Sequence, residues 1–260
     1  MPSRQPKRST PAWARALQWS VGCLSLATVA ATAADGATGR CEARSPAQRQ
    51  TVVELYTSEG CNSCPPADKF LSTLKGRPGV LAAAFHVDYW DNLGWADRFA
   101  SPRYTRRQAE QQSHSGARFN YTPQVLANGL DWRSWPRLPE PVLTAPVQIS
   151  LQRQSATRLV AEVKPLAGAP AKLGLWWARL EDGHVSPVRA GENAGVTLRH
   201  DHVVREYAEL PVWANDGAHS WTIDSAAAAA SVTHQPGSRW LVVVTDGSNG
   251  APLQALELGC

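Results

Sequence analysis

The sequence predicts an α/β domain near the N-terminus, followed by an all-β, sandwich-like domain. Residues 51–135 alternate strand and helix patterns around a Cys-x-x-Cys formed by Cys61 and Cys64. Residues 147–260 contain only short strand patterns separated by Gly, Pro, Asn and Asp. The segment between the two domains, 136–146, holds four prolines and is predicted to be a linker.

The Cys-x-x-Cys lies where a predicted strand meets a predicted helix. Thr51–Thr57 is rich in β-branched and aromatic residues, as strands are. From Ala67, apolar residues recur at i, i+3, i+4 and i+7, which predicts a helix over Ala67–Lys75 that ends at Gly76. The apolar run Val80–Trp90 then predicts a buried strand, parallel to the first because a helix connects the two.

Two cysteines at a helix start favour reversible redox chemistry. If Cys61 caps the helix, the positive end of the helix dipole stabilises its thiolate, and Cys64 then resolves a mixed disulfide. A structural disulfide is one competing interpretation, but so short a loop constrains the unfolded chain little. A chance pair of core thiols is another, which the position at a helix start disfavours. A zinc site would need a second pair of ligands. Glu59, Glu54 and His86 are candidates for a proton relay, although Glu59 would oppose thiolate formation at close range.

Residues 1–33 are predicted to be an export signal, followed by an N-terminal extension over 34–50. A basic start precedes a short apolar stretch, and Ala31-Thr-Ala33 supplies a cleavage site. Because 1–33 holds four basic and no acidic residues, the mature chain has 22 of each and a net charge near zero. We therefore expect a periplasmic or secreted protein with no nucleic-acid partner and no membrane span after cleavage.

The remaining cysteines outside the signal are Cys41 and the C-terminal Cys260. An oxidising compartment permits disulfides, so we predict that these two residues pair and tie the ends of the mature chain together. Two free thiols are the alternative.

The segment after the second predicted strand holds a surface helix and a hairpin. Ser101 and Pro102 are typical of the N-cap and first position of a helix, which ends near Gly116. Its arginines are predicted to form a solvated face, with an anion site as the minor alternative: Arg98, Arg103, Arg106 and Arg107. Thr122-Pro123 precedes a strand that ends in the hairpin turn Asn128-Gly129.

This order of elements resembles the thioredoxin-like fold. The resemblance implies that Pro123 is cis and lies against the dithiol, and that the backbone of Thr122 pairs with substrate. We assign Thr122 and Tyr121 to substrate binding on this basis. The chain departs from thioredoxin at Gly60, where thioredoxin has an aromatic residue, and Glu54 matches its buried acid only loosely.

From about residue 52 onward, the chain more closely resembles an exported bacterial thioredoxin-like family catalogued as a domain of unknown function. The matching stretches are Glu54–Asp68, His86–Asp91, Tyr121–Gly129 and Gly191–Gly195. They are specific as family markers and imply no substrate.

The second half is predicted to be a sandwich of short strands. Its tryptophans are expected in the core and at the edges of the sheets rather than on a carbohydrate platform. His200 and His202 would point to one face of a strand, as a metal pair does, but no third ligand has convincing spacing. Ser225–Ser231 is predicted to be a short helix or loop. The strands are expected at Val147–Leu151, Arg158–Lys164, Leu173–Leu180, Val196–Leu210, Arg239–Thr245 and Leu253–Leu258.

The function predicted from these patterns is thiol–disulfide exchange by Cys61 and Cys64, without a cofactor or metal. The substrates would be exported proteins or small thiols and disulfides, served by an unidentified redox partner. A copper-binding or copper-delivery protein is the alternative, because Cu(I) prefers thiolates and Cys61, Cys64 and His86 offer three ligands. A binding module that has lost its redox activity is the third hypothesis.

Overall fold

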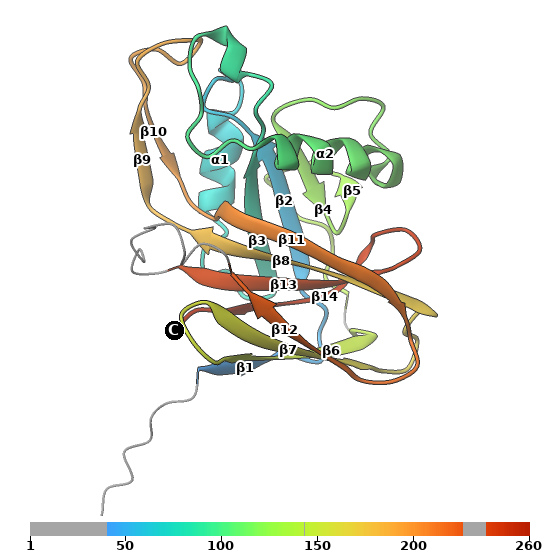
Figure 1. The fold of residues 1–260 in the computed structure, drawn as a ribbon. Coiled ribbons are helices and arrows are strands. Elements are labelled where there is room, and N and C mark those ends of the chain that lie inside the picture. Colours follow the sequence, from blue (N-terminus) through green and yellow to red (C-terminus); the bar gives the residue numbers. More distant parts are fainter. Residues whose placement is uncertain (1–40, 143, 226–237) are drawn as a thin grey trace, which may run out of the picture. The chain divides into compact units, whose positions relative to one another are not determined.

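A computed structural model describes residues 41–142, 144–225 and 238–260 (Figure 1). Of these residues, 43% are in strands and 12% in helices, so the protein is mostly β. The helices are α1 (Pro65–Ser72), α2 (Pro102–Ser115) and the short 3₁₀ helix η1 (Asp91–Leu93). The strands are β1 (Glu42–Arg44), β2 (Thr51–Thr57), β3 (Val80–His86), β4 (Gln124–Ala127), β5 (Leu130–Asp131), β6 (Val147–Arg153), β7 (Arg158–Pro165), β8 (Lys172–Glu181), β9 (His184–Pro187), β10 (Thr197–His200), β11 (Val203–Ala214), β12 (His219–Asp224), β13 (Arg239–Asp246) and β14 (Pro252–Leu258).

Four predicted segments fall wholly or partly outside the described residues. These are the signal 1–33, the start of the extension 34–50, residue 143 of the linker 136–146, and most of the segment Ser225–Ser231. Within the described residues, no helix is both long enough and apolar enough to cross a membrane.

Local patterns predicted the elements around the cysteines well. β2 and β3 are parallel, with Thr51 opposite Val80, and α1 connects them as expected. Val53 and Leu55 on one face of β2 pack against α1. The turn between β4 and β5 has positive φ at Asn128 (52°) and Gly129 (83°), the conformation that a two-residue hairpin of this type requires.

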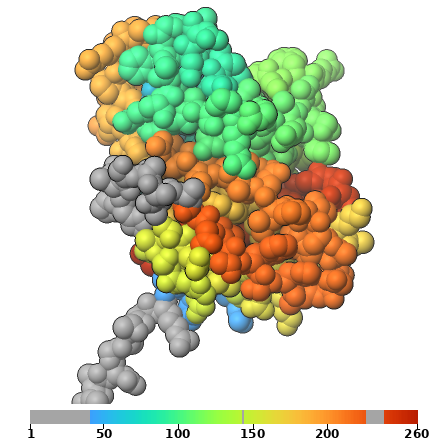
Figure 2. All heavy atoms as spheres, in the orientation of Figure 1, coloured from blue at the N-terminus to red at the C-terminus, as the bar shows by residue number. Residues whose placement is uncertain are grey.

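The predicted fold class is wrong, because the described residues contain no separate α/β domain. One eight-stranded sheet has the order β14-β13-β8-β11-β3-β2-β4-β5 and so joins strands from both halves of the chain. β11 continues the sheet by pairing in parallel with β3, with Val203 opposite Ala84. In Figure 2 the green atoms around α2 lie directly against the orange atoms of β11, and the Tyr104 hydroxyl donates to the Val204 carbonyl.

A second sheet, β1-β6-β7-β12, covers one face of the C-terminal strands. Alternate residues of β8 divide between two cores, as the period of a strand requires. Leu175 and Trp177 pack with β6 and β7, whereas Trp176 and Ala178 pack with residues of β2 and β3. The strand β8 therefore holds the two halves of the chain together.

The prediction of a solvated arginine face is wrong for one of its four residues. Ser101 caps α2 as predicted, because its side chain accepts a hydrogen bond from the Arg103 amide. Arg98, Arg103 and Arg106 are exposed, but Arg107 is only 2% exposed and faces the core. Arg98 precedes α2, and the three arginines within this polar helix carry no sequence signal that one of them is buried.

Candidate functional site

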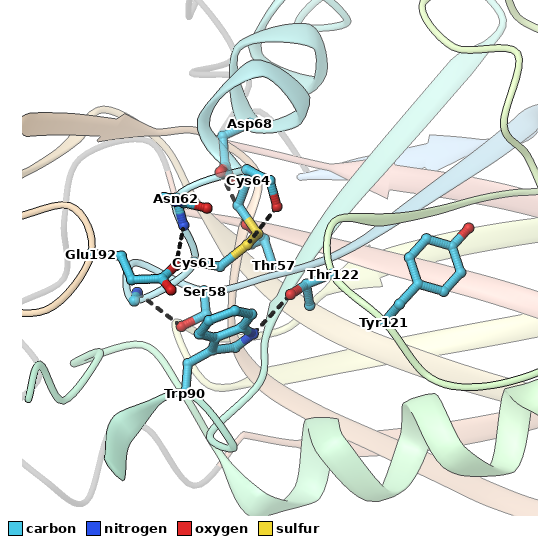
Figure 3. Close-up of a disulfide and its surroundings, with 12 residues drawn as sticks. Thr57, Ser58, Cys61, Asn62, Cys64, Asp68, Trp90, Tyr121, Thr122 and Glu192 are labelled. Atoms are coloured by element: carbon cyan, nitrogen blue, oxygen red, sulfur yellow. Dashed lines mark hydrogen bonds between the residues drawn. A yellow bond between two sulfur atoms is a disulfide. The ribbon is translucent and has the colours of Figure 1, made fainter. Parts of the chain in front are cut away.

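The Cys-x-x-Cys lies in the loop between β2 and α1 (Figure 3). Cys61 and Cys64 form a disulfide with an S–S distance of 2.15 Å, and both residues are fully buried. Cys64, rather than Cys61, is the N-cap of α1, and its amide donates to the Cys61 carbonyl. Cys61 therefore lies one turn before the helix, further from the helix dipole than a capping residue would be.

The two residues between the cysteines face solvent. Asn62 and Ser63 are both exposed. The Ser63 hydroxyl lies 3.4 Å from the Cys61 sulfur, so it is placed to donate a hydrogen bond to a thiolate at that position. Solvent therefore reaches this loop through its backbone and polar side chains rather than through the sulfurs.

The loop of residues 191–195, between β9 and β10, holds the cysteine loop in place. The Asn193 side-chain amide donates to the carbonyls of Glu59 (2.9 Å) and Cys61 (3.0 Å). The Glu192 carboxylate accepts a hydrogen bond from the backbone amide of Asn62, as Figure 3 shows. In the sequence, Gly191–Gly195 stands out only as a family marker, and nothing local signals that it contacts a loop so distant in the chain.

The Thr122–Pro123 peptide is cis and enters β4 beside the end of β2, because Gln124 lies opposite Tyr56. The Trp90 indole links this segment to the cysteine loop. Its N–H donates to the Thr122 hydroxyl at 2.8 Å, and the Cβ of Trp90 would lie 3.0 Å from any Cβ added at Gly60.

Tyr121, the other residue assigned to substrate binding, is engaged elsewhere. In Figure 3 its ring is turned away from the disulfide, and its hydroxyl donates to Asp131 at 2.6 Å. Burial and this hydrogen bond raise the pKa of Tyr121 to about 12. The structure therefore places Thr122, but not the ring of Tyr121, close to the cysteine loop.

The three proton-relay candidates lie in different surroundings. Glu59 is fully buried; burial opposes its ionisation, but polar contacts with His200, Ser186 and Trp95 outweigh burial and lower its pKa. Glu54 is on the opposite face of β2 from α1, where its carboxylate lies 2.6 Å from Arg107. The structure therefore directs the Glu59 carboxylate towards His200, Ser186 and Trp95, and it directs Glu54 into another part of the core.

His86 belongs to a buried charged cluster that no sequence pattern indicated. Its Nδ1 lies 2.6 Å from an Asp97 oxygen. Burial opposes ionisation of Asp97, but His86 and the amides of Glu59 and Phe99 lower the pKa of Asp97 to about 2. Burial would lower the pKa of His200, but the carboxylates of Asp68 and Glu59 raise it to about 9.

His200 and His202 do not form the metal pair that their spacing suggested. The chain turns between β10 and β11, and His202 has a φ of 58°. The Nδ1 of His202 accepts a hydrogen bond from the Arg239 guanidinium at 2.7 Å. Arg239 is distant in the sequence from the residues that surround His200. Burial, followed by the charge of Arg239, lowers the pKa of His202 to about 4.

We expect His202 to make the protein less stable in mild acid. The unfolded chain takes up this proton near the ordinary histidine pKa of 6.5, whereas the folded chain takes it up only near 4, so stability falls as the pH drops between these values. Between pH 7 and pH 5, His202 should account for about 2 kcal/mol of the stability that the wild type loses. His202→Asn should remove this part of the loss, and asparagine tolerates the positive φ. Urea unfolding at both pH values measures this loss. The exposed control His114→Asn should keep the wild-type loss, and an unchanged loss in His202→Asn would contradict the assignment.

Cys41 and Cys260, the predicted structural pair, are joined by a disulfide with an S–S distance of 2.04 Å. The copper alternative requires Cys61 and Cys64 as thiolates, so it applies only to a chain in which their disulfide has been reduced. Copper binding stays a prediction, and titration of the reduced protein with Cu(I) would test it.

Comparison with other proteins identifies a family and two similar structures. The model of the family described as "Protein of unknown function (DUF1223)" matches residues 52–244. No curated protein matches the chain. The crystal structure of protein AGR_C_4864 from Agrobacterium tumefaciens has a TM-score of 0.59 and 23% identity, covering 80% of this chain and 93% of that one. HBP35 of Porphyromonas gingivalis has a TM-score of 0.57 and 16% identity, covering 82% of this chain and 76% of that one. Since the DUF1223 family model matches well over half of the chain, this protein belongs to the DUF1223 family, whose function is unknown.

Proposed function

We propose that this protein is an exported thiol–disulfide oxidoreductase that uses Cys61 and Cys64. The observation that carries the proposal is a disulfide of sequence separation 3 in the loop between β2 and α1. Closing so short a loop stabilises a protein by about 2 kcal/mol or less in the chain-entropy account. A purely structural role for this disulfide therefore has little physical advantage. The export pattern of residues 1–33 supports an oxidising compartment.

The exchange proceeds in two steps that conserve atoms and electrons. In the dithiol form, the Cys61 thiolate attacks a substrate disulfide, forms a mixed disulfide and releases one substrate thiolate. Cys64 loses its proton and attacks the Cys61 sulfur, which reforms the Cys61–Cys64 disulfide and releases the second substrate thiolate. Two electrons pass to the substrate, and the reverse sequence oxidises a substrate dithiol.

The surroundings of the cysteines suit parts of this chemistry. The Ser63 hydroxyl, 3.4 Å from the Cys61 sulfur, supports a thiolate there. The Glu59 carbonyl shares the Asn193 amide with the Cys61 carbonyl, and Glu59 would serve as the proton acceptor. Thr122, which Trp90 links to the cysteine loop, would offer its backbone to substrate, and Pro123 lies at the entrance to β4. Because both sulfurs are buried, a substrate reaches them only after the loops around them open locally.

Asn193 is expected to control this opening. Asn193→Ala removes the amide that bridges the carbonyls of Glu59 and Cys61, so the cysteine loop should open more often. We expect reduction of the Cys61–Cys64 disulfide by dithiothreitol to become roughly 5–10-fold faster, which corresponds to about 1–1.4 kcal/mol for the two hydrogen bonds lost together. Samples taken at successive times are alkylated to stop the reaction, and mass spectrometry of these samples gives the rate of disulfide reduction.

The matched control is Asn215→Ala, which removes an amide bonded to the carbonyl of Pro170, away from the cysteine loop. Its reduction rate should equal that of the wild type. Equal rates for Asn193→Ala and the wild type would show that the loop 191–195 does not limit access.

Trapping experiments test the proposed function itself. With Cys64→Ser, the mixed disulfide on Cys61 cannot be resolved, so adducts with exported proteins should accumulate and appear on non-reducing gels. Cys61→Ser is the matched control and should trap none. The wild type should also accelerate insulin reduction or the oxidation of a reduced peptide. Absence of both adducts and activity would refute the proposal.

A further inference from the structure

Three buried side chains from separate elements converge beside the cysteine loop. Asp68 comes from α1, His86 from the end of β3 and His200 from the end of β10. One potential metal-ligating atom from each lies within 4.8 Å of the other two, and all three residues are buried. Elements distant in the sequence thus bring two imidazoles and a carboxylate to one point inside the protein.

The orientation of His86 leaves one of its nitrogens without a partner. Its Nδ1 is 2.6 Å from Asp97, whereas Nε2 has no hydrogen-bond partner although the side chain is fully buried. Burying a polar atom without a partner is energetically unfavourable. A carboxylate on one imidazole nitrogen and a free second nitrogen is the arrangement that metal-binding histidines adopt.

His200 has a similar arrangement. Its Nδ1 is 3.6 Å from one oxygen of Asp68, and its Nε2 is 3.3 Å from Glu59. Neither nitrogen has the geometry of a hydrogen bond. The other oxygen of Asp68 accepts from the Thr57 hydroxyl at 3.0 Å, which leaves the first oxygen directed at the imidazole.

The charge of the cluster favours a cation. The carboxylates of Glu59, Asp68 and Asp97 are all buried, and in the described part of the chain their ion pairs are formed only with His86 and His200. Even with both imidazoles protonated, these five groups carry a net charge of −1. An added cation would neutralise this buried excess charge, which is otherwise costly.

We propose that Asp68, His86 and His200 bind a divalent transition-metal ion, with Zn²⁺ as the ion of choice. Two imidazoles and a carboxylate are a common zinc ligand set, and Asp97 and Glu59 would orient the two histidines as outer partners. A tetrahedral zinc site sets its ligand atoms about 3.4 Å apart, so small side-chain movements close the observed cluster around an ion. The site contains no sulfur, so it does not depend on the proposed thiol exchange.

Zinc binding is tested on the wild-type protein with both disulfides intact, so that no thiolate competes for the ion. The protein carries no histidine tag, so that no imidazole from a tag competes either. Because the cluster is buried, the protein is unfolded without reductant and refolded with Zn²⁺, then dialysed. We expect one Zn²⁺ per chain by elemental analysis. X-ray absorption should show nitrogen and oxygen ligands that include two imidazoles. Less than stoichiometric zinc, or a site without imidazole, would overturn the proposal.

Variants locate the site. His86→Gln and His200→Gln should each weaken zinc binding more than 100-fold, and Asp97→Asn should weaken it 10–100-fold as an outer partner does. The matched control is His184→Gln, because His184 lies opposite His200 in the β9–β10 pair but outside the cluster, and it should bind zinc like the wild type. Circular dichroism checks folding, and if a variant misfolds, the X-ray absorption of the wild type decides. Wild-type affinity in folded His86→Gln and His200→Gln would refute the site.

Discussion

Replacing Arg107 with methionine is expected to lower the free energy of unfolding by about 3–5 kcal/mol, because the change leaves a buried charge without its partner. The Arg107 guanidinium is 2.6 Å from Glu54, and its charge lies over the rings of Phe85, Trp176 and Tyr207 at 4.8–4.9 Å from their centroids. Burial alone would lower the pKa of Arg107, but Glu54 reverses this effect and raises it. These contacts join α2 and β2 to β8 and β11, so the substitution weakens the junction between the two halves of the chain.

Two variants separate the lost charge pair from other effects. Glu54→Gln combined with Arg107→Met removes both charges and should recover most of the lost stability, as replacement of a whole buried pair often does. Arg106→Met, at the exposed neighbouring position, should change stability by no more than about 0.5 kcal/mol. Urea unfolding measures all three variants. Equal stability of the Arg107→Met and Arg106→Met proteins would show that the Glu54–Arg107 pair does not support the fold.

Replacing both Cys41 and Cys260 with serine is expected to lower the free energy of unfolding by about 4–5 kcal/mol. Their disulfide spans a sequence separation of 219, so it removes far more freedom from the unfolded chain than the separation of 3 between Cys61 and Cys64. It ties β1 to the end of β14, which lie in different sheets.

The matched comparison replaces Cys61 and Cys64 with serine, which should cost about 2 kcal/mol or less. Urea unfolding of the two double variants under non-reducing conditions gives both values. The two disulfides would then have separate roles: Cys41–Cys260 would stabilise the fold, and Cys61–Cys64 would be available for thiol–disulfide exchange. Equal losses in the two variants, or a larger loss for Cys61 and Cys64, would contradict this division.

Local patterns in the sequence predicted elements but not their partners. The strand Thr51–Thr57 and the turn at Asn128 and Gly129 were predicted correctly, because β-branched content and turn chemistry act over a few residues. The pairing of β11 with β3 was missed, since any exposed strand edge accepts a partner and no pattern names it. The predicted strand Val196–Leu210 is divided at His202, whose positive φ has no signal in a histidine.

The candidate site was predicted to a similar extent. Cys61 and Cys64 were found because the spacing of two cysteines before a helix is itself informative. Asn193, Asp68 and Asp97 were missed because their roles depend on contacts between distant segments. His200 was noted only as a possible metal pair with His202, and no residue outside the copper alternative was assigned as a metal ligand.

Alkylation of the folded protein during a graded titration with dithiothreitol tests the central claim that the Cys61–Cys64 disulfide opens and closes in the native state. Mass spectrometry follows each cysteine, and circular dichroism follows the fold. We predict that Cys61 and Cys64 become alkylated together while the fold is retained and Cys41–Cys260 stays closed, and that oxidant restores their disulfide. The claim is contradicted if Cys61 and Cys64 react only under conditions that unfold the protein.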